Sequence, residues 1–415
     1  MLFEPLKLRG VTFRNRIGVS PMCQYSSVDG LADDWHLVHL GSRAVGGAGL
    51  VMTEATAVEP RGRISPQDLG LWNDEQLEPL ARVTRFLRDR GAASGVQLAH
   101  AGRKASTARP WEGGKPLAPP AGWSPIVAPT ALAFDDGYQT PAALGESEIA
   151  ALLEAFAAAA ARAVRAGFDV IEIHAAHGYL IHEFLSPLSN HRDDQWGGSF
   201  DARVRFLLEI VRAVRRVWSE ARPLLVRLST TDWLGADGWT VEDSIALARR
   251  LGAEGVDLVD CSSGGIAPGV AIDAGPGYQT ANAAASGTKR RSRPPPSASS
   301  LRRPKPSTFC APDRRTWSFS RASFCAIPTG RCARRASWAP PSRLPHSTIA
   351  PGAEIGRNYR KRTLAKRSQR TSFSGASGGW TRFVPSQVNA GPGFPRWMGG
   401  SSRPSQAWPL LPSNS

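Results

Sequence analysis

The segment "EIHAAHGYLIH" (172–182) places His174, His177, Tyr179 and His182 within nine positions. Two of these histidines could hold a metal ion, although no nearby side chain supplies the third protein ligand that such a site needs. They could instead stabilise a packed turn. As a third possibility, two neutral imidazoles could donate hydrogen bonds to one substrate oxygen, while Tyr179 supplies a proton from its hydroxyl. The position directly after an apolar run favours this third interpretation, a polar catalytic site.

A second candidate segment, "SPMCQYSS" (20–27), also follows an apolar run and contains Cys23 and Tyr25. A lone cysteine is often an inert buried thiol that packs as a small hydrophobic residue. If both segments end parallel strands of one barrel, however, Cys23 and Tyr25 face the same opening as the histidine pair. In that arrangement the thiol could contact a ligand.

Polar side chains in two further segments suggest a bound cofactor. In "QLAHAGRK" (97–104), the Gln97 amide suits the donor and acceptor edge of a heterocycle. Arg103 and Lys104 could bind an anion or belong to a solvated basic loop. Arg227 lies within the apolar run 224–231, where a buried arginine requires an anionic or polar partner. A cofactor is a good candidate for that partner.

Short apolar runs that alternate with helical patterns must position these residues. The helical patterns cover 74–91, 147–167 and 201–218, with Ser147 as a candidate N-cap and Gly167 at the C-terminal end of its helix. This alternation predicts an α/β fold with a parallel sheet, and no GxGxxG follows the first strand. We therefore expect a (β/α)8 TIM barrel with the site at the C-terminal strand ends. The predicted strands are 16–20, 49–56, 95–102, 169–176, 224–231 and 256–263.

The chain changes character near residue 280. Residues 1–280 hold 27 basic and 33 acidic residues, a net charge of −6, whereas residues 281–415 hold 24 basic and two acidic residues, a net charge of +22. The stretch 288–307 is rich in Arg, Pro and Ser and lacks apolar periodicity, as is typical of disorder. We therefore expect an incomplete barrel of about six β/α units over 1–280 and a low-complexity, disordered basic tail over 281–415.

Several motifs, taken together, resemble the Old Yellow Enzyme family over residues 1–280. Cys23 and Tyr25 match its bacterial xenobiotic-reductase-like branch, and His182 and His191 match family positions without an assignable role. The family comprises FMN-dependent ene-reductases and NAD(P)H dehydrogenases. The matching segments are, in barrel order, "SPMCQYSS", "EAT" (54–56), "QLAHAGRK", "GFDVIEIHAAHGYLIHEFLSPLSNHRDD" (167–194), "GGS" (197–199) and "SSGG" (262–265).

The resemblance implies an FMN flavoprotein that takes hydride from NADPH or NADH and reduces an enone-type substrate. His174 and His177 would bind the substrate carbonyl oxygen, and Tyr179 would protonate the α-carbon after flavin N5 delivers hydride to the β-carbon. Tyr25 would help to position the substrate, and Cys23 would tune the flavin. The residues that would contact FMN are Ser20, Pro21, Met22, Cys23, Ala55, Gln97 and Arg227.

The sequence departs from the family after residue 280. The family continues with two strands, the last of which carries a Gly-Arg pair that holds the FMN phosphate. Read one base out of frame, codons for 316–332 permit a family-like last strand and helix that end in Asp-Pro-Tyr-Trp-Pro-Leu. We therefore expect a frameshift near 280–290, in the gene or in its sequencing, that leaves two open sheet edges and removes the C-terminal segment through which this branch forms dimers. The alternative to an active homo-oligomeric enzyme is a non-functional remnant without FMN.

Other classes of protein fit less well. No stretch reaches the ~18–20 apolar residues of a membrane span, and the N-terminus lacks the pattern of a signal peptide. The five cysteines form no CxxC pair, which indicates a reducing, cytoplasmic location. Their spacing also differs from the cluster of the related iron–sulfur dienoyl reductases. The tail has no aromatic–basic motif or folded module, so we expect no nucleic-acid partner.

Overall fold

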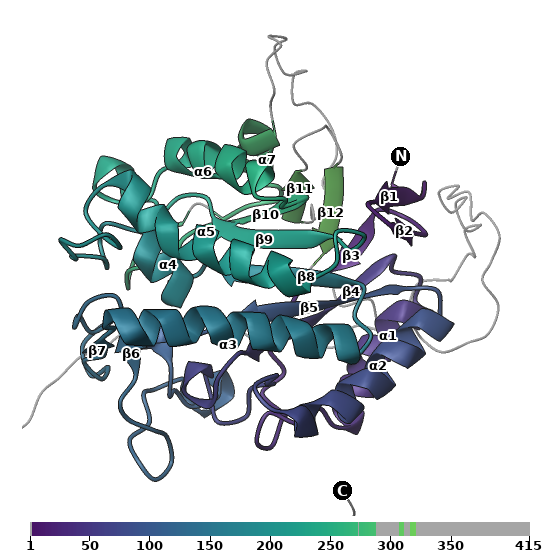
Figure 1. Ribbon diagram of the computed structural model, residues 1–415, viewed down its shortest axis with the longest axis horizontal. Coiled ribbons are helices and arrows are strands. Elements are labelled where there is room, and N and C mark those ends of the chain that lie inside the picture. The colour runs from purple at the N-terminus through teal and green to yellow at the C-terminus, as the bar shows by residue number, and fades with distance from the viewer. Residues whose placement is uncertain (1, 273, 288–306, 311–315, 321–415) are drawn as a thin grey trace, which may run out of the picture. The chain divides into compact units, whose positions relative to one another are not determined.

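The computed structural model describes residues 2–272, 274–287, 307–310 and 316–320. These residues form a closed eight-stranded barrel with helices packed around it (Figure 1). Around the ring, the strands follow the order β10-β11-β12-β3-β4-β5-β8-β9. Their bounds are β3 (Ile17–Val19), β4 (Leu50–Ala57), β5 (Ala93–Ala99), β8 (Val170–Ala175), β9 (Leu224–Ser229), β10 (Leu258–Ser262), β11 (Ser307–Cys310) and β12 (Thr316–Ser320).

Six of these strands, from β3 to β10, pair in parallel with their neighbours, which confirms the predicted β/α units. The register brings polar side chains of adjacent strands together. Arg227 on β9 is paired with His174 on β8 and with Asp260 on β10, and Gln97 on β5 is paired with Glu172 on β8. Parallel pairing also places the C-terminal ends of all six strands at one end of the barrel, which we call the C-terminal rim.

Two short strands after residue 280 close the ring. β11 runs antiparallel to both β10 and β12, and β12 runs parallel to β3. This closure corrects the expectation of two open sheet edges, although an antiparallel strand departs from a regular (β/α)8 barrel. Apart from α7 and these two strands, the tail expected to be disordered lies outside the described residues.

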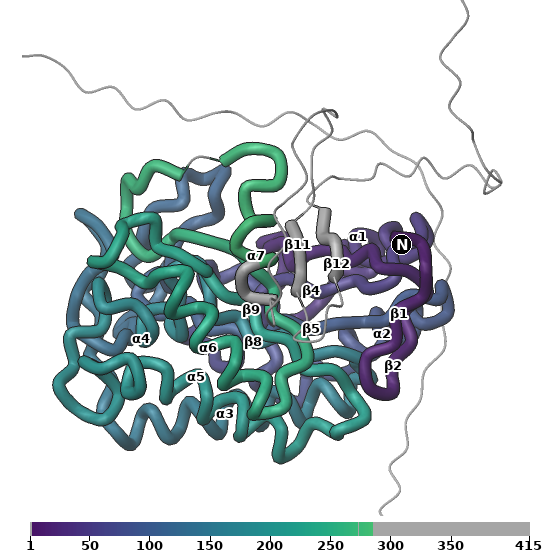
Figure 2. Tube along the Cα trace, turned by 90° about the horizontal axis from the view of Figure 1, so that it is seen from above, coloured from purple at the N-terminus to yellow at the C-terminus, as the bar shows by residue number. Residues whose placement is uncertain are grey.

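Helices cover the outside of the parallel strands, as the view from above shows (Figure 2). The three predicted helices are confirmed as α2, α3 and α5. Helix α3 begins at Glu146, and its N-cap is Gly145, whose backbone N–H donates to the Glu148 carboxylate. The predicted Ser147 cap is therefore wrong, because Ser147 lies inside the helix. Gly167, predicted at the C-terminal end of this helix, follows the observed C-cap Ala166 and adopts φ 82°. The helices are α1 (Asp34–Val45), α2 (Leu77–Asp89), α3 (Glu146–Arg165), α4 (Leu180–Leu185), α5 (Phe200–Val217), α6 (Val241–Ala253) and α7 (Thr280–Gly287).

An N-terminal hairpin of β1 (Leu6–Leu8) and β2 (Val11–Phe13) closes the opposite end of the barrel. Leu6, Leu8 and Phe13 pack there against residues at the N-terminal ends of the strands, such as Leu50 and Val170. Two further short strands, β6 (Val127–Ala128) and β7 (Ala142–Ala143), pair with each other outside the barrel. Apolar side chains therefore fill the N-terminal end of the barrel, and the predicted polar site is expected at the C-terminal rim. Within the described ranges, no helix is long and apolar enough to cross a membrane.

Candidate functional site

A cavity of about 300 Å³ opens at the C-terminal rim. This volume lies at the lower end of the range for small-molecule sites. Of the eleven residues that the sequence predicts for the site, ten line this cavity. The eleventh, Ser20, is buried beside Pro21, and its hydroxyl has no hydrogen-bond partner among the described residues. The lining residues are Pro21, Met22, Cys23, Tyr25, Ala55, Gln97, His174, His177, Tyr179 and Arg227.

The histidine pair is held in a defined orientation. The Nδ1 atom of His174 accepts the backbone N–H of Ala176 at 3.2 Å, which places the proton of that ring on Nε2. This Nε2 lies 3.3 Å from Nδ1 of His177, whose own Nε2 lies 2.6 Å from the Ser262 hydroxyl. Burial lowers the pKa of both imidazoles well below the usual value, and the Arg227 charge lowers it further. Both rings are therefore neutral, and each carries one N–H to donate.

Tyr179 follows the histidines and lies against them, with its ring centroid 5.1 Å from that of His174. Burial raises the pKa of the Tyr179 phenol well above its usual value, so the hydroxyl keeps its proton. Burial also raises the pKa values of Cys23 and Tyr25, whose side chains are hydrogen-bonded to each other. The cavity therefore contains a thiol and two phenols that are all protonated at neutral pH.

The loop that carries Cys23 and Tyr25 is held by a buried glutamate. Glu54 accepts the backbone N–H of Gln24 at 2.9 Å, and its other oxygen lies 3.1 Å from His36 Nε2 on α1. Strand β4 is irregular at this point, because its register with β5 shifts between Met52 and Ala55. Such a bulge changes the direction of the strand and turns Ala55 toward the cavity.

Beneath the cavity lies a buried polar layer of Gln97, Glu172, Arg227 and Asp260. The Gln97 amide donates to Glu172 at 2.8 Å, which leaves the Gln97 carbonyl oxygen available to a ligand. Arg227 Nε lies 3.3 Å from Asp260, so the protein itself supplies the anionic partner that this arginine requires. Burial raises the pKa of Glu172 to about 8 and that of Asp260 to about 6. The repulsion between these carboxyls adds to the Glu172 shift, and Arg227 opposes both.

Arg103 and Lys104 form neither a solvated loop nor an open anion site. Lys104 Nζ donates to the carbonyl oxygens of His177 at 2.9 Å and Gly265 at 3.1 Å, and Arg103 donates to that of Ile266 at 2.7 Å. Burial lowers the pKa of Lys104 to about 8. The two cations therefore join the loops that follow β5, β8 and β10.

The two loops after β8 and β10 approach each other at a pair of glycines. Gly178 has φ 72°, and a Cβ atom added there would lie 2.0 Å from the carbonyl oxygen of Gly265. A Cβ at Gly265 would in turn lie 2.7 Å from the carbonyl of His177. Only glycine at both positions allows this backbone contact, which fixes His177 beside Ser262 at the end of β10.

The residues around the cavity fit a flavin ring. The free Gln97 carbonyl oxygen, the Arg227 guanidinium and the unpaired Ser20 hydroxyl suit the polar edge of a planar heterocycle. The Cys23 thiol and Ala55 contribute less polar surface. No group of three or more His, Cys, Asp or Glu side chains in the described part of the chain could hold a metal ion.

The sequence motifs assign no role to Ser262, His182 or Asp232. Ser262 contacts His177, and its only signal was its position at a strand end, within the "SSGG" segment. His182 and Asp232 form a buried pair, with His182 Nε2 2.9 Å from Asp232 Oδ1. Because 50 residues separate these two, no local pattern could have predicted their contact.

Comparison with known proteins identifies the family. Residues 1–286 match the model of the NADH:flavin oxidoreductase / NADH oxidase family. The chain belongs to this family. It is 52% identical to an NADH:flavin oxidoreductase of Gibberella zeae over 293 residues, 67% of this chain and 71% of that protein. It is 48% identical to an NADPH dehydrogenase of Bacillus subtilis over 280 residues, 67% of this chain and 77% of that protein.

Among solved structures, the chain is similar to an Old Yellow Enzyme homologue from Zymomonas mobilis, with a TM-score of 0.52 and 30% identity over 61% of this chain and 71% of that one. The resemblance to the Old Yellow Enzymes and the TIM-barrel prediction are thereby confirmed. This member of the NADH:flavin oxidoreductase family is an FMN-dependent oxidoreductase.

Proposed function

We propose that this chain reduces activated alkenes, such as α,β-unsaturated carbonyl compounds, with NADPH or NADH as the hydride donor. The observation that carries the proposal is the geometry of His174 and His177. Their facing nitrogens lie 3.3 Å apart in the cavity, and both rings are neutral. In the tautomer in which Nε2 of His177 accepts the Ser262 hydroxyl proton, Nδ1 carries the ring proton. The two facing N–H groups can then bind one carbonyl oxygen between them and stabilise the negative charge that develops on it.

Tyr179 is the proposed proton donor. Bound FMN, once it has accepted hydride from NADPH or NADH, would supply hydride to the β-carbon of the alkene. The α-carbon then needs a proton, and the Tyr179 Oη–H bond breaks to supply it, after which solvent reprotonates the phenolate. The raised pKa of Tyr179 keeps this proton in place until negative charge appears on the substrate. Tyr25, which shares the cavity, would orient the substrate.

The proposed cofactor contacts come from the polar edge and the strand ends described above. Gln97 and Arg227 would bind the polar edge of the flavin, and the Cys23 thiol would tune its redox properties. Ser20, Pro21, Met22 and Ala55 would line the rest of the ring site.

We further propose that residues 1–280 specify the FMN-binding domain and that residues 281–415 are an out-of-frame tail, of which the short strands β11 and β12 nonetheless close the barrel. The jump in net charge supports this boundary, as does the end of the family match at residue 286. DNA sequencing across codons 275–290 tests it. If repeated sequencing gives the same reading frame as the printed sequence, a sequencing error is excluded.

An absorbance spectrum of the purified chain, with NADPH added anaerobically, tests the function. We expect a flavin band near ~450 nm that NADPH bleaches and that an enone such as 2-cyclohexenone restores. A band that NADPH bleaches but the enone does not restore would contradict the proposed substrate class. The absence of any flavin band would support the alternative, a remnant of the enzyme that does not retain FMN.

A further inference from the structure

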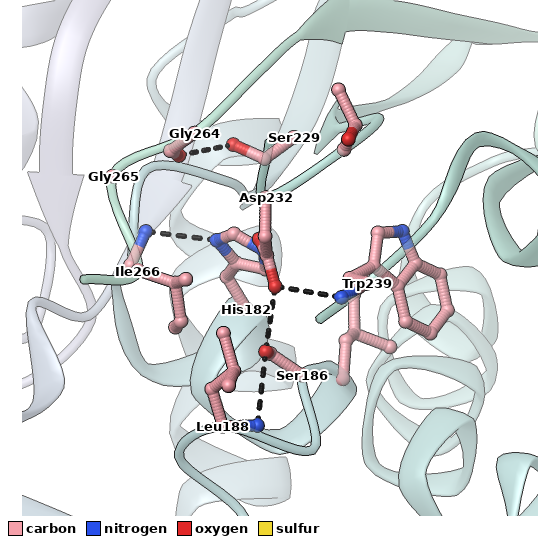
Figure 3. A network of polar contacts seen from close by, with 12 residues as sticks. His182, Ser186, Leu188, Ser229, Asp232, Trp239, Gly264, Gly265 and Ile266 are labelled. Atoms are coloured by element: carbon pink, nitrogen blue, oxygen red, sulfur yellow. Dashed lines mark hydrogen bonds and ion pairs between the residues drawn. The ribbon is translucent and has the colours of Figure 1, made fainter. Parts of the chain in front are cut away.

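A buried network of His182, Ser186, Asp232 and Trp239 contacts the turn that follows β8 (Figure 3). His182, on α4, is fully buried, and its Nδ1 accepts the backbone N–H of Gly178 at 2.9 Å. Its Nε2 faces Asp232, which is also fully buried, at 2.9 Å. The network therefore links a side chain of the loop after β9 to the backbone of the loop after β8.

Hydrogen bonding fixes the protonation of this pair. Because Nδ1 of His182 accepts a hydrogen bond, the ring proton lies on Nε2 and faces Asp232. Burial alone would raise the pKa of Asp232, but His182 and the donors Trp239 N–H and Ser186 Oγ–H lower it below the usual value. Asp232 is thus a carboxylate, and it keeps the acceptor nitrogen of His182 turned toward the Gly178 amide. Gly178 lies between His177 and Tyr179 in the sequence.

The turn needs such support because its backbone is strained. His177 has φ 62° and Gly178 φ 72°, and a non-glycine residue in this region costs on the order of 1–3 kcal/mol. Buried side chains hold three of the turn's backbone groups. Ser229 accepts the His177 N–H at 2.9 Å, Lys104 donates to the His177 carbonyl, and His182 accepts the Gly178 N–H.

We propose that His182 and Asp232 are positioning residues that fix the turn 176–179 and thereby aim the His177 imidazole and the Tyr179 phenol into the cavity. Neither residue lines the cavity. His182 is the only described acceptor of the Gly178 amide. The effect of these two residues on catalysis rests on the proposed function, whereas their effect on the structure of the turn does not.

Two substitutions separate the role of the hydrogen bond from that of packing. His182→Leu fills the space but leaves the Gly178 N–H without an acceptor. In His182→Gln, the side-chain oxygen can accept that N–H while the amide donates to Asp232. Thr84→Val is the matched control, because it removes one buried hydrogen bond, from Thr84 Oγ1 to the Ala166 carbonyl, far from the turn.

Hydrogen–deuterium exchange of the full-length variants measures the turn directly and needs no bound FMN. Since an amide without its acceptor opens more readily, we expect peptides covering 176–181 to exchange about tenfold faster in His182→Leu and to recover most of their protection in His182→Gln. Exchange that stays at the wild-type level in His182→Leu would overturn the proposal. So would equal acceleration at 176–181 in Thr84→Val.

Turnover per bound FMN gives the second readout. We expect kcat for enone reduction to fall about tenfold in His182→Leu and to be largely restored in His182→Gln, because a small displacement of a catalytic group has a large effect on rate. If His182→Leu does not fold, Asp232→Asn replaces it, and unchanged exchange in that variant overturns the proposal. Wild-type protein that reduces no enone would refute the proposed function, whereas the exchange data would still decide the role of His182.

Discussion

Polar groups at the two ends of the barrel differ in whether they have hydrogen-bond partners. At the N-terminal end, Asp257 accepts hydrogen bonds from Arg9 Nε at 2.6 and 2.8 Å, from Arg215 at 2.9 Å and from the Leu224 N–H at 2.9 Å. At the C-terminal rim, by contrast, the Ser20 hydroxyl and one oxygen of Glu183 are buried without a hydrogen-bond partner among the described residues. The Asp257 cluster thus uses its polar groups for stability, whereas these groups at the rim remain available. Arg16 and Arg222, which precede β3 and β9, also have a buried nitrogen without a hydrogen-bond partner among the described residues.

Backbone strain is also present at the functional end. Tyr25, His177 and Trp233 all have φ between 52° and 65°, and each follows a barrel strand. Strain and unpaired polar atoms both reduce stability, so their concentration at the C-terminal rim indicates that the fold gives up stability where ligands bind. Four substitutions test this difference between the ends.

The largest effect is expected from Tyr179→Phe, which removes only the proposed proton donor. Reoxidation of the reduced flavin by an enone should slow by about 10²–10⁴-fold, the usual contribution of a positioned acid. Flavin reduction by NADPH, which needs no proton from Tyr179, should change little. Stopped-flow absorbance measures the two half-reactions separately, and an equal loss in both would contradict the role of Tyr179.

Asp257→Ala, at the N-terminal end of the barrel, should lower stability and leave turnover unchanged. Removing this carboxylate leaves Arg9, Arg215 and the Leu224 N–H without their shared acceptor, so the free energy of unfolding should fall by about 3 kcal/mol. Turnover per folded, FMN-bound molecule should be unchanged. Urea denaturation combined with active-site titration measures both quantities, and a fall in turnover without a loss of stability would contradict the distinction between the ends.

Glu183→Gln should change the pH dependence of stability. Burial raises the pKa of Glu183 to about 8, although the Arg103 charge and backbone N–H and the Lys104 charge oppose the shift. Between pH 4.5 and 8 the folded protein therefore holds a proton that the unfolded chain has released, so this group makes the protein less stable as pH rises through that window. The glutamine variant should gain on the order of 2 kcal/mol relative to wild type between pH 5 and pH 7. Parallel stability curves in urea would contradict the raised pKa.

The smallest effect is expected from Ser262→Ala. The Ser262 hydroxyl lies 2.6 Å from Nε2 of His177 and helps to orient that ring. Loss of this hydrogen bond should weaken carbonyl binding by about 1 kcal/mol, or several-fold in KM, with a smaller change in kcat. Steady-state kinetics over a range of enone concentrations measures the two parameters, and an unchanged KM would show that Ser262 does not orient the imidazole.

Much of the fold and the site was predictable because the signals are local. Each predicted strand coincides with an observed one, and the residues that follow β3, β5 and β8 meet at one rim because parallel strands all end there. Helix α1 was missed, since its buried face includes His36, His39 and Gly41 in place of a regular apolar stripe.

The remaining features depend on contacts between distant segments. Lys104 donates to carbonyl oxygens 73 and 161 residues away in the sequence, and His182 contacts Asp232, 50 residues away. No local pattern indicates whether a basic residue will be solvated or will bind such carbonyl groups. The antiparallel direction of β11 was likewise unpredictable, because it is set by its neighbours β10 and β12.

The contact between Gly178 and Gly265 has a consequence for anyone who wishes to redesign the substrate range. Any side chain at either position would push the two loops apart and displace His177, so a library randomised there would consist mostly of inactive members. Trp111 is a better target. It is 65% exposed, and its ring packs in a T-shaped arrangement against the Tyr25 ring at the site, with 5.7 Å between centroids. Diversity at this outer position would reshape the entrance and leave the catalytic geometry intact.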